Sequence, residues 1–300
     1  MKENIKQLIN KGFFHIFGAN VVNKIIQFAS SIFLVRLLSK EQFGLFSYAQ
    51  NIISIFLLFN GLGVTSGLLQ YARESESIDD RNSFFKYGAK FGISFNLIVC
   101  LLILVYSNLM PIKIQGARPI LTSMFLLPLL TFIFETIQIY FRASLENKKF
   151  SFLSTLNTFF IFVFSVIGAY LYKVIGIVIF RYLAYAITIL VGVKLLGNNL
   201  IKIFQSNNLD SKVKRQFMKF SLVSSFNNAI SQLLYTIDIF LIGVFIIDET
   251  VIASYKTATL IPFALNFIPI SVMVFIYPYF AKNNYNKEWL KSNYIKLTKY

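Results

Sequence analysis

Long apolar runs recur through almost the whole chain, and they constrain its fold more than any other feature. Each run reaches about 18 residues or more with few charges, which is long enough to cross a bilayer as a helix. Only 14% of the residues are charged and 56% are hydrophobic, whereas a soluble domain has about 25% charged residues. The sequence therefore predicts an all-α polytopic membrane protein.

The expected transmembrane helices number about eight. Charged and polar segments between the apolar runs set their boundaries, and an even number places both ends of the chain on one side of the membrane. The spans are expected at residues 13–38, 44–69, 88–109, 119–141, 151–172, 174–196, 219–247 and 251–280.

Lys and Arg are distributed very unevenly between the two sides of these spans. Of the 29 cationic residues, 21 fall on the side of the two termini, five fall on the opposite side and three lie inside spans. Cationic loops remain in the cytoplasm during insertion, so both termini are expected there. The same rule accounts for the net charge of +16, and no nucleic-acid partner is expected. The single cysteine, Cys100, excludes a disulfide within one chain.

An internal repeat relates the start of the chain to its last third. At a shift of 207 positions, Asn20 aligns with Asn227, Glu41 aligns with Asp248, and the tripeptide IFL occurs in both copies. Both copies start on the cytoplasmic side, which predicts parallel repeats of the kind found in secondary transporters.

The linker-like segment "NNLIKIFQSNNLDSKVKRQ" divides the two copies of the repeat. Residues 1–200 are expected to form an N-terminal lobe of about six spans, and residues 201–300 the start of a C-terminal lobe of about two spans. Because the second copy has two spans where the first has six, we expect the second lobe to be truncated.

Two consecutive segments resemble a known family of transporters. They read "VRLLSKEQFGLFSYAQNI" at 35–52 and "NGLGVTSGLLQYARE" at 60–74, with a Gly after an acidic and aromatic turn and a Gly-rich second span. The stretch at 253–283, with its late Pro278, is similar to the eighth span of the same family. The chain thus resembles the Wzx-type polysaccharide flippases of the MOP superfamily.

This resemblance implies two six-helix lobes around a central cavity, with alternating access. It implies a flippase that moves undecaprenyl-pyrophosphate-linked oligosaccharide across the bacterial inner membrane for O-antigen, capsule or another surface polysaccharide. Membrane lipids, a polysaccharide polymerase and a chain-length regulator are the further partners expected. A MATE-type cation-coupled drug or metabolite antiporter of the same fold is the alternative.

Four of the spans carry polar residues three and four positions apart, so each of these helices has one polar face. Such faces are what an aqueous cavity between helices requires. They comprise Asn20, Lys24, Gln27 and Ser31 in the first span, Thr131, Glu135, Gln138 and Arg142 in the fourth, Ser224, Asn228, Ser231, Tyr235 and Asp238 in the seventh, and Tyr255, Lys256 and Thr259 in the eighth.

The cations inside the spans are candidate cargo-binding residues. Lysine is a compact charge with three donors that suits phosphate oxygens, so Lys24 and Lys256 are expected to attract the pyrophosphate group. The alternative is a buried ion pair with Glu135 or Asp238, or, for Lys256, an interfacial position. Arg181 is either a further cavity cation or an interfacial anchor.

Glu135 and Asp238 are the carboxylates well inside the spans. Burial favours their protonated forms, which would allow proton coupling during transport. A permanent salt bridge to a lysine is the alternative for each. The amides of Asn20, Gln27, Gln138 and Asn228 complete the polar cavity residues that the sequence predicts.

An enzyme is the least favoured class. The sequence contains no nucleophile elbow, no paired acidic metal motif and no nucleotide-binding loop, which are the signatures of the corresponding enzymes. Its single histidine, His15, lies near a span end. We therefore expect a protein that is not an enzyme and has no catalytic residues, metal site or cofactor.

Overall fold

The computed structural model describes residues 13–75, 77–265, 287–288, 290–291 and 294. The chain divides into two compact units, Met1–Ala258 and Thr259–Tyr300. In the second unit, the described residues are the end of one helix and a few positions near the end of the chain. The cavity and the residue contacts described below all lie in the first unit.

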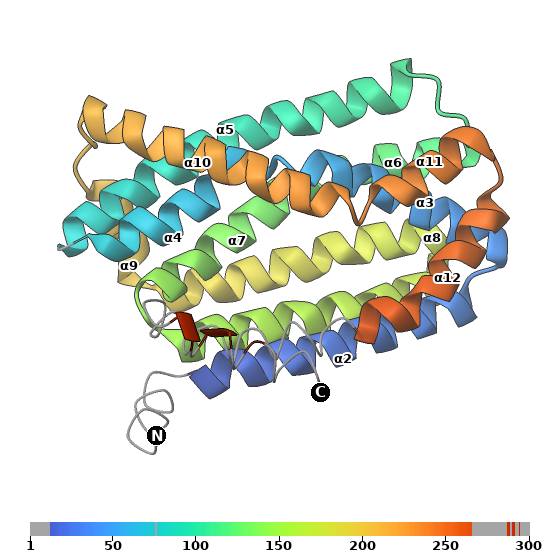
Figure 1. Cartoon of the computed structure of the whole chain (residues 1–300), viewed down its shortest axis with the longest axis horizontal. Helices are drawn as coiled ribbons and strands as arrows, with labels where there is room; N and C mark the ends of the chain where they lie inside the picture. The colour runs from blue at the N-terminus through green and yellow to red at the C-terminus, as the bar shows by residue number, and fades with distance from the viewer. Residues whose placement is uncertain (1–12, 76, 266–286, 289, 292–293, 295–300) are drawn as a thin grey trace. The chain divides into compact units, whose positions relative to one another are not determined.

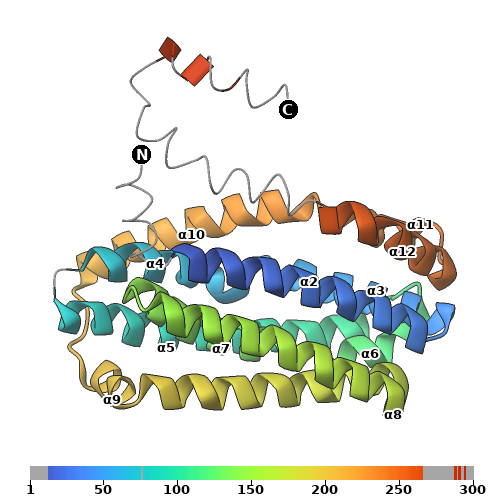
Figure 2. The same cartoon turned by 90° about the horizontal axis from the view of Figure 1, so that it is seen from below.

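Every regular element in the described residues is a helix (Figure 1). The long helices of the first unit lie roughly alongside one another (Figure 2). In chain order the elements are α2 (Phe13–Leu37), α3 (Lys40–Leu57), η1 (Asn60–Gly63), α4 (Val64–Glu74), α5 (Ile78–Leu109), η2 (Gln115–Ala117), α6 (Arg118–Ser123), α7 (Leu127–Ala143), α8 (Asn147–Leu196), α9 (Asn198–Gln205), α10 (Ser211–Leu233), α11 (Ile237–Phe245) and α12 (Glu249–Leu265).

The described helices include four that are long and apolar enough to cross a membrane, or up to six if each of two bent pairs is one span. The four are Ile16–Leu37, Lys40–Glu74, Ile78–Leu109 and Asn147–Leu196. The bent pairs join η2 and α6 to α7 at 42° and α10 to α11 at 57°. The chain is therefore a multi-pass membrane protein, and most of the predicted spans fall on these helices. The eighth predicted span lies partly outside the described residues, beyond Leu265.

The element α8 consists of two antiparallel helices joined by a very tight turn. Lys173 has a left-handed backbone conformation, with φ of 52°, and this reverses the chain. Gly168 and Gly176 face one another across the turn, where a Cβ on either glycine would overlap the backbone of the other. The 50 residues of α8 thus supply two crossings, as the predicted spans at 151–172 and 174–196 require. The first of them packs along α2 (Figure 1).

The segment from Lys40 to Glu74 is helical at both ends and broken in the middle. The helix α3 begins with a capping box, in which Ser39 and Gln42 each bond the other's backbone N–H. It ends at Leu57, and three successive residues then take positive φ: Gly61 at 56°, Leu62 at 50° and Gly63 at 75°. The predicted second span is therefore two shorter helices with an irregular connection between them.

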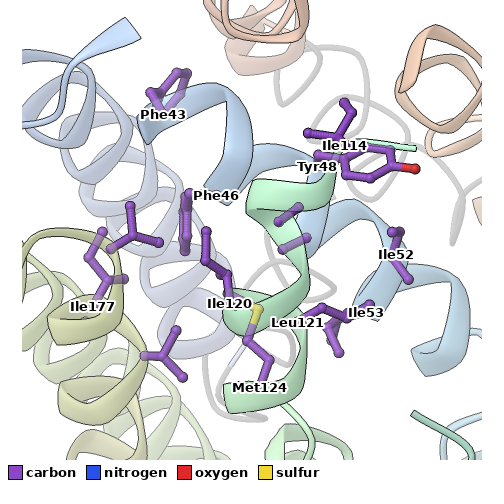
Figure 3. Close-up of a cluster of buried hydrophobic side chains, with 14 of the residues drawn as sticks. Phe43, Phe46, Tyr48, Ile52, Ile53, Ile114, Ile120, Leu121, Met124 and Ile177 are labelled. Atoms are coloured by element: carbon purple, nitrogen blue, oxygen red, sulfur yellow. The ribbon is translucent and has the colours of Figure 1, made fainter. Parts of the chain in front are cut away.

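A buried apolar core holds α3 against α6 and the turn of α8. Phe46, Ile52, Leu121, Met124 and Ile177 are each at most 3% exposed, and Figure 3 shows their side chains meeting between these helices. Such packing supplies the van der Waals contacts that hold transmembrane helices together. A second core surrounds Phe132, Phe141 and Phe217, joining α7 to α4, α5 and α10.

Candidate functional site: a polar cavity beside the helix break

A polar cavity of about 560 Å³ opens where the segment from Lys40 to Glu74 is broken. Helices α3, α4, α7 and α10 and the connection η1 form its walls. Its lining is Ser54, Leu57, Leu58, Asn60, Gly63, Thr65, Ser66, Thr131, Glu135, Ser225, Asn228, Ser231 and Gln232.

Most of the polar groups in this lining are hydroxyls and amides. Six Ser and Thr residues and the amide-bearing Asn60, Asn228 and Gln232 line it together with one carboxylate residue, Glu135. No lysine or arginine belongs to the lining among the described residues. The cavity is thus rich in neutral donors and acceptors, a composition suited to a polyhydroxylated or amide-bearing ligand.

Glu135 is tied to the helix break by one hydrogen bond. The side-chain amide of Asn60, the first residue of η1, donates to Glu135 Oε2 at 3.1 Å. The next residue, Gly61, donates its backbone N–H to Asn96 Oδ1 at 3.4 Å, and Asn96 is fully buried in α5. The broken segment is therefore held from two sides, by α7 and by α5. The other side-chain atom of Asn60, Oδ1, is buried without a hydrogen-bond partner.

Close contacts between α10–α11 and the broken segment lie on both sides of the cavity. Before the break, Asn51 of α3 donates a hydrogen bond at 2.9 Å to the carbonyl of Thr236, where α10 gives way to α11. After the break, Gly63 lies so close to Ser221 of α10 that a Cβ would overlap its carbonyl oxygen. The cavity occupies the stretch between these two contacts.

Two of the predicted polar residues, Glu135 and Asn228, line the cavity. Thr131 and Ser231, from the same predicted polar faces, line it as well. Gln138 lies one turn beyond Glu135 in α7 and is not among the lining residues. The fourth and seventh predicted spans thus bring the centres of their polar faces together.

The polar face of the first span lies elsewhere. Asn20, Lys24 and Gln27 are exposed on α2 and do not line the cavity. The opposite side of α2 packs on α8, where Asn23 donates a hydrogen bond to Ser154. Within the described residues, Lys24 forms no ion pair with Glu135 or Asp238. Its role in cargo binding stays a prediction.

Arg181 is held by neutral groups near the turn of α8. Its guanidinium lies 3.4 Å from Gln50 Oε1 and 3.4 Å from Ser165 Oγ, and it stacks over the ring of Phe46 at 5.0 Å. Gln50 is one turn from the cavity residue Ser54, whose hydroxyl bonds the Gln50 carbonyl. Arg181 is therefore a cation close to the cavity that has no carboxylate partner in the described part of the chain.

Asp238 belongs to a separate polar group past the bend between α10 and α11. Its carboxylate accepts a hydrogen bond from the hydroxyl of Tyr255 in α12. Lys256, the next residue, is close enough for its charge to interact with that of Asp238. In the loop nearby, Asp248 caps α12, and hydrogen bonds from Thr250 hold the pKa of that carboxyl below its ordinary value.

The sequence reasoning missed several lining residues, of which Asn60 is the most informative. Asn60 directly precedes the Gly-Leu-Gly of the break, and this turn sequence inside an apolar run was the available signal. A polar residue next to such a signal sits where the backbone leaves the helix and lines a cavity. Ser54, Thr65, Ser66, Ser225 and Gln232 were not singled out as site residues either.

The family model described as polysaccharide biosynthesis protein matches residues 9–284. The chain belongs to this family. The resemblance seen in the sequence is thereby confirmed. No curated protein matches the chain.

Solved structures of MATE and MOP transporters share the fold of this polysaccharide biosynthesis protein. A crystal structure of a mutant MATE protein has a TM-score of 0.60 at 15% identity, covering 78% of this chain and 55% of the other. An outward-facing multidrug resistance MATE transporter has a TM-score of 0.58 at 14% identity, covering 90% and 71%.

A MOP superfamily transporter from Pyrococcus furiosus has a TM-score of 0.52 at 19% identity, and the match covers 78% of this chain and 54% of the other. The chain spans little more than half the length of two of these three structures. These likenesses confirm the predicted all-helical membrane fold of the MOP type.

Proposed function

We propose that this protein is a flippase that translocates undecaprenyl-pyrophosphate-linked oligosaccharide repeat units across the bacterial inner membrane. The observation that carries the proposal is the match to the polysaccharide biosynthesis family over residues 9–284. The products would serve O-antigen, capsule or another surface polysaccharide. The chain would lie in the inner membrane with both termini in the cytoplasm, acting as a transporter and not as an enzyme.

The chemistry of the cavity supports an oligosaccharide as cargo. Sugar hydroxyls both donate and accept hydrogen bonds, and a cavity wall of Ser, Thr, Asn and Gln side chains offers both functions. Burying a sugar hydroxyl without a hydrogen-bond partner costs free energy. Such a lining would replace the hydrogen bonds to water that the sugar loses when it enters the cavity. The oligosaccharide would occupy the space beside Asn60, Thr65 and Asn228.

The pyrophosphate would be attracted by the cations of the spans. Arg181 is the best placed, since Gln50 connects it to the cavity residue Ser54 and no carboxylate in the described residues neutralises it. A guanidinium can bind phosphate oxygens with two parallel hydrogen bonds. Lys24 and Lys256 would act in the same way at other points of the path. A polymerase and a chain-length regulator would use the translocated product.

The alternative function is cation-coupled antiport of a drug or metabolite, as in the MATE type. The carboxylate of Glu135 favours it, because an acidic group in the lumen attracts organic cations. The hydroxyl-rich lining around Glu135 favours the sugar cargo instead. The two functions differ in the charge of the cargo, and experiments can separate them.

The first experiment is deletion of the gene followed by extraction of cell lipids. The flippase function predicts accumulation of undecaprenyl-pyrophosphate-linked repeat units, loss of the surface polysaccharide, and restoration of both by the intact gene. Unchanged lipid-linked repeats together with greater sensitivity to organic cations would contradict the flippase function and support antiport. Cells that make the Arg181→Ala protein at a normal level in the membrane are the control. Accumulation of the lipid-linked repeats in these cells would show that it results from lost transport and not from the absence of the protein.

A further inference from the structure

We propose that the helix α9 and the first turns of α10 form a docking surface for anionic phospholipid headgroups of the surrounding membrane. The two helices follow one another after the second crossing of α8. The inference does not depend on the cargo, because it concerns the outer surface of the chain and not the polar cavity.

The first observation is the direction of α9. This helix lies at the end of α8 and runs across the ends of the long helices instead of along them (Figure 1, Figure 2). Two hydrogen bonds fix the chain directly after it. Lys86 of α5 donates to the carbonyl of Ser206 at 2.7 Å, and the side chain of Asn207 donates to Asp79 at 3.0 Å. A helix that crosses the ends of transmembrane helices lies in the plane of the membrane surface.

The second observation is an apolar face of α9 that the protein covers only in part. Leu200 and Ile203 pack against the second apolar core. Ile201 and Phe204 continue this face around the helix, but they are 56% and 69% exposed. An amphipathic helix at a membrane surface inserts such apolar side chains between the headgroups and the lipid chains. The other residues of α9 are polar, and they are Asn198, Asn199, Lys202 and Gln205.

The third observation is a stripe on α10 that changes from cationic to apolar. Lys212, Arg215 and Lys219 are three and four residues apart, so they lie on one face of the helix, and all three are exposed. The same spacing continues through Val223 and Phe226, which are both 54% exposed. A membrane helix shows this change where it leaves the lipid chains and enters the headgroup region. The stripe therefore places the headgroups beside residues 212–219.

The fourth observation is the charge of the segment, which favours anionic lipid as the partner. Residues 194–219 include six cationic residues and one carboxylate, Asp210. Asp210 caps α10 by accepting a hydrogen bond from the backbone N–H of Lys212. Clusters of about four or more Lys and Arg next to a transmembrane helix attract anionic headgroups. Five of the six cations are exposed, and they are Lys194, Lys202, Lys212, Arg215 and Lys219.

The carboxylates of the neighbouring turn between α4 and α5 belong to another surface. Glu74, Asp79 and Asp80 line a pocket of about 450 Å³ together with Asp210. Among the described residues, the lining of this pocket includes neither the exposed apolar residues of α9 nor the three cations of the α10 stripe. A headgroup can therefore contact those cations without entering the acidic pocket.

The test measures which lipids gather around α9 in the full chain. A fluorophore is attached to Gln205→Cys, an exposed position of α9, in a background with Cys100 replaced by Ala. The protein is reconstituted in phosphatidylcholine vesicles that contain a small fraction of nitroxide-labelled phosphatidylglycerol or nitroxide-labelled phosphatidylcholine. Because a nitroxide quenches only a fluorophore close to it, the ratio of the two quenching efficiencies reports the local enrichment of the anionic lipid.

We expect both lipids to quench the fluorophore, with phosphatidylglycerol clearly the stronger quencher at low salt. The ratio should fall toward one as NaCl is added, because salt screens the attraction between the cations and the headgroups. Absence of quenching by either lipid would overturn the proposal, since α9 would then lie away from the membrane and be open to a soluble partner. Equal quenching by the two lipids at low salt would overturn the selection of anionic lipid.

Matched variants locate the surface. The triple variant Lys212→Gln, Arg215→Gln and Lys219→Gln should bring the ratio close to one, because a single cation near an anionic surface changes the association by about fivefold. The same loss of charge at the exposed residues Arg36, Lys40 and Lys113 is the control and should leave the ratio unchanged. An unchanged ratio in the folded triple variant of α10 would overturn the proposed surface.

A second variant tests the apolar face of α9. Ile201→Ser combined with Phe204→Ser should weaken the quenching by both lipids, because the helix then loses its apolar contact with the membrane. Unchanged quenching would overturn the insertion of this face. The salt titration of the chain without these substitutions decides the role of charge if a variant does not fold.

Discussion

The amide of Asn60 donates a hydrogen bond to the carboxylate of Glu135, with 3.1 Å between Nδ2 and Oε2. Asn60 begins the irregular connection η1, whereas Glu135 lies in the continuous helix α7. This bond therefore joins the one segment of the cavity wall that lacks regular helical hydrogen bonding to a rigid neighbour. The carboxylate of Glu135 therefore has two roles: it lines the cavity, and it holds the connection at the helix break in place.

Removing this donor should destabilise the protein. Asn60→Leu leaves the Glu135 carboxylate without its hydrogen bond, and we expect a loss of about 1–3 kcal/mol in the free energy of unfolding. The same substitution in a Glu135→Gln background should cost less, because no charge is then left unpaired. Thermal unfolding of the four proteins forms a double-mutant cycle, with an expected coupling of about 0.5–3 kcal/mol. Additive effects would show that the two residues do not interact.

A methyl group at Gly63 should separate α4 from α10. The new Cβ would overlap the carbonyl oxygen of Ser221, and Ala disfavours the φ of 75° found at Gly63. We expect Gly63→Ala to lower the free energy of unfolding by about 1–3 kcal/mol, measured by thermal unfolding in detergent. Gly18→Ala is the matched control, because no atom lies within 4 Å of its added Cβ. Equal stability of the two variants would contradict the close contact.

Cysteine labelling should reveal the orientation in the membrane. In a background with the buried Cys100 replaced by Ala, Lys173→Cys places a thiol at the exposed turn of α8. An impermeant maleimide added to intact spheroplasts should label it. Asn208→Cys, in the exposed connection between α9 and α10, should react only after the membrane is permeabilised. Labelling of Asn208→Cys alone in intact spheroplasts would reverse the predicted topology.

The lysines inside the spans should be required for export if they attract pyrophosphate. We expect Lys24→Ala to abolish surface polysaccharide and Lys256→Ala to reduce it, because a phosphate group loses a cationic partner in each case. Both are measured by complementation of the deletion strain, with membrane levels of the protein checked by immunoblot. Lys40→Ala, an exposed lysine at the start of α3, is the control. Normal export by the double variant of Lys24 and Lys256 would remove both from the cargo path.

Hydropathy alone predicted most of the helices, because the requirement for about 20 apolar residues per crossing leaves a clear signal in the sequence. It even separated the two halves of α8 at Lys173, where one charged residue interrupts a long apolar run. The three- and four-residue spacing in α7 and α10 likewise placed Glu135 and Asn228 on the faces that line the cavity. In both helices the regular helical period held long enough for sequence spacing to define a face.

The spacing failed where the helices bend. Asp238 continues the polar face of α10 in the sequence, but the 57° bend before α11 removes it from that line and places it beside Tyr255. The partner of Glu135 could not be predicted for a related reason. Asn60 reaches the carboxylate from a non-helical connection whose three positive φ values follow no periodic pattern. The sequence spacing predicted that α2 has a polar face. It could not predict that this face lies away from the cavity, because that depends on how α2 packs against the other helices.

The contact of Gly63 with Ser221 has one more consequence, for the ease with which these helices separate. The hydroxyls of Ser221 and of Ser225, one turn later, are buried, and neither has a hydrogen-bond partner in the described residues. Keeping a hydroxyl dry and unpaired costs about 1–3 kcal/mol, while the glycine contact contributes only van der Waals attraction. Packing α4 against α10 therefore removes water from the hydroxyls of two serines without giving them a new hydrogen-bond partner. Water entering from the cavity would satisfy both hydroxyls. Separating α4 from α10 here would therefore break no hydrogen bond between the two helices at these positions.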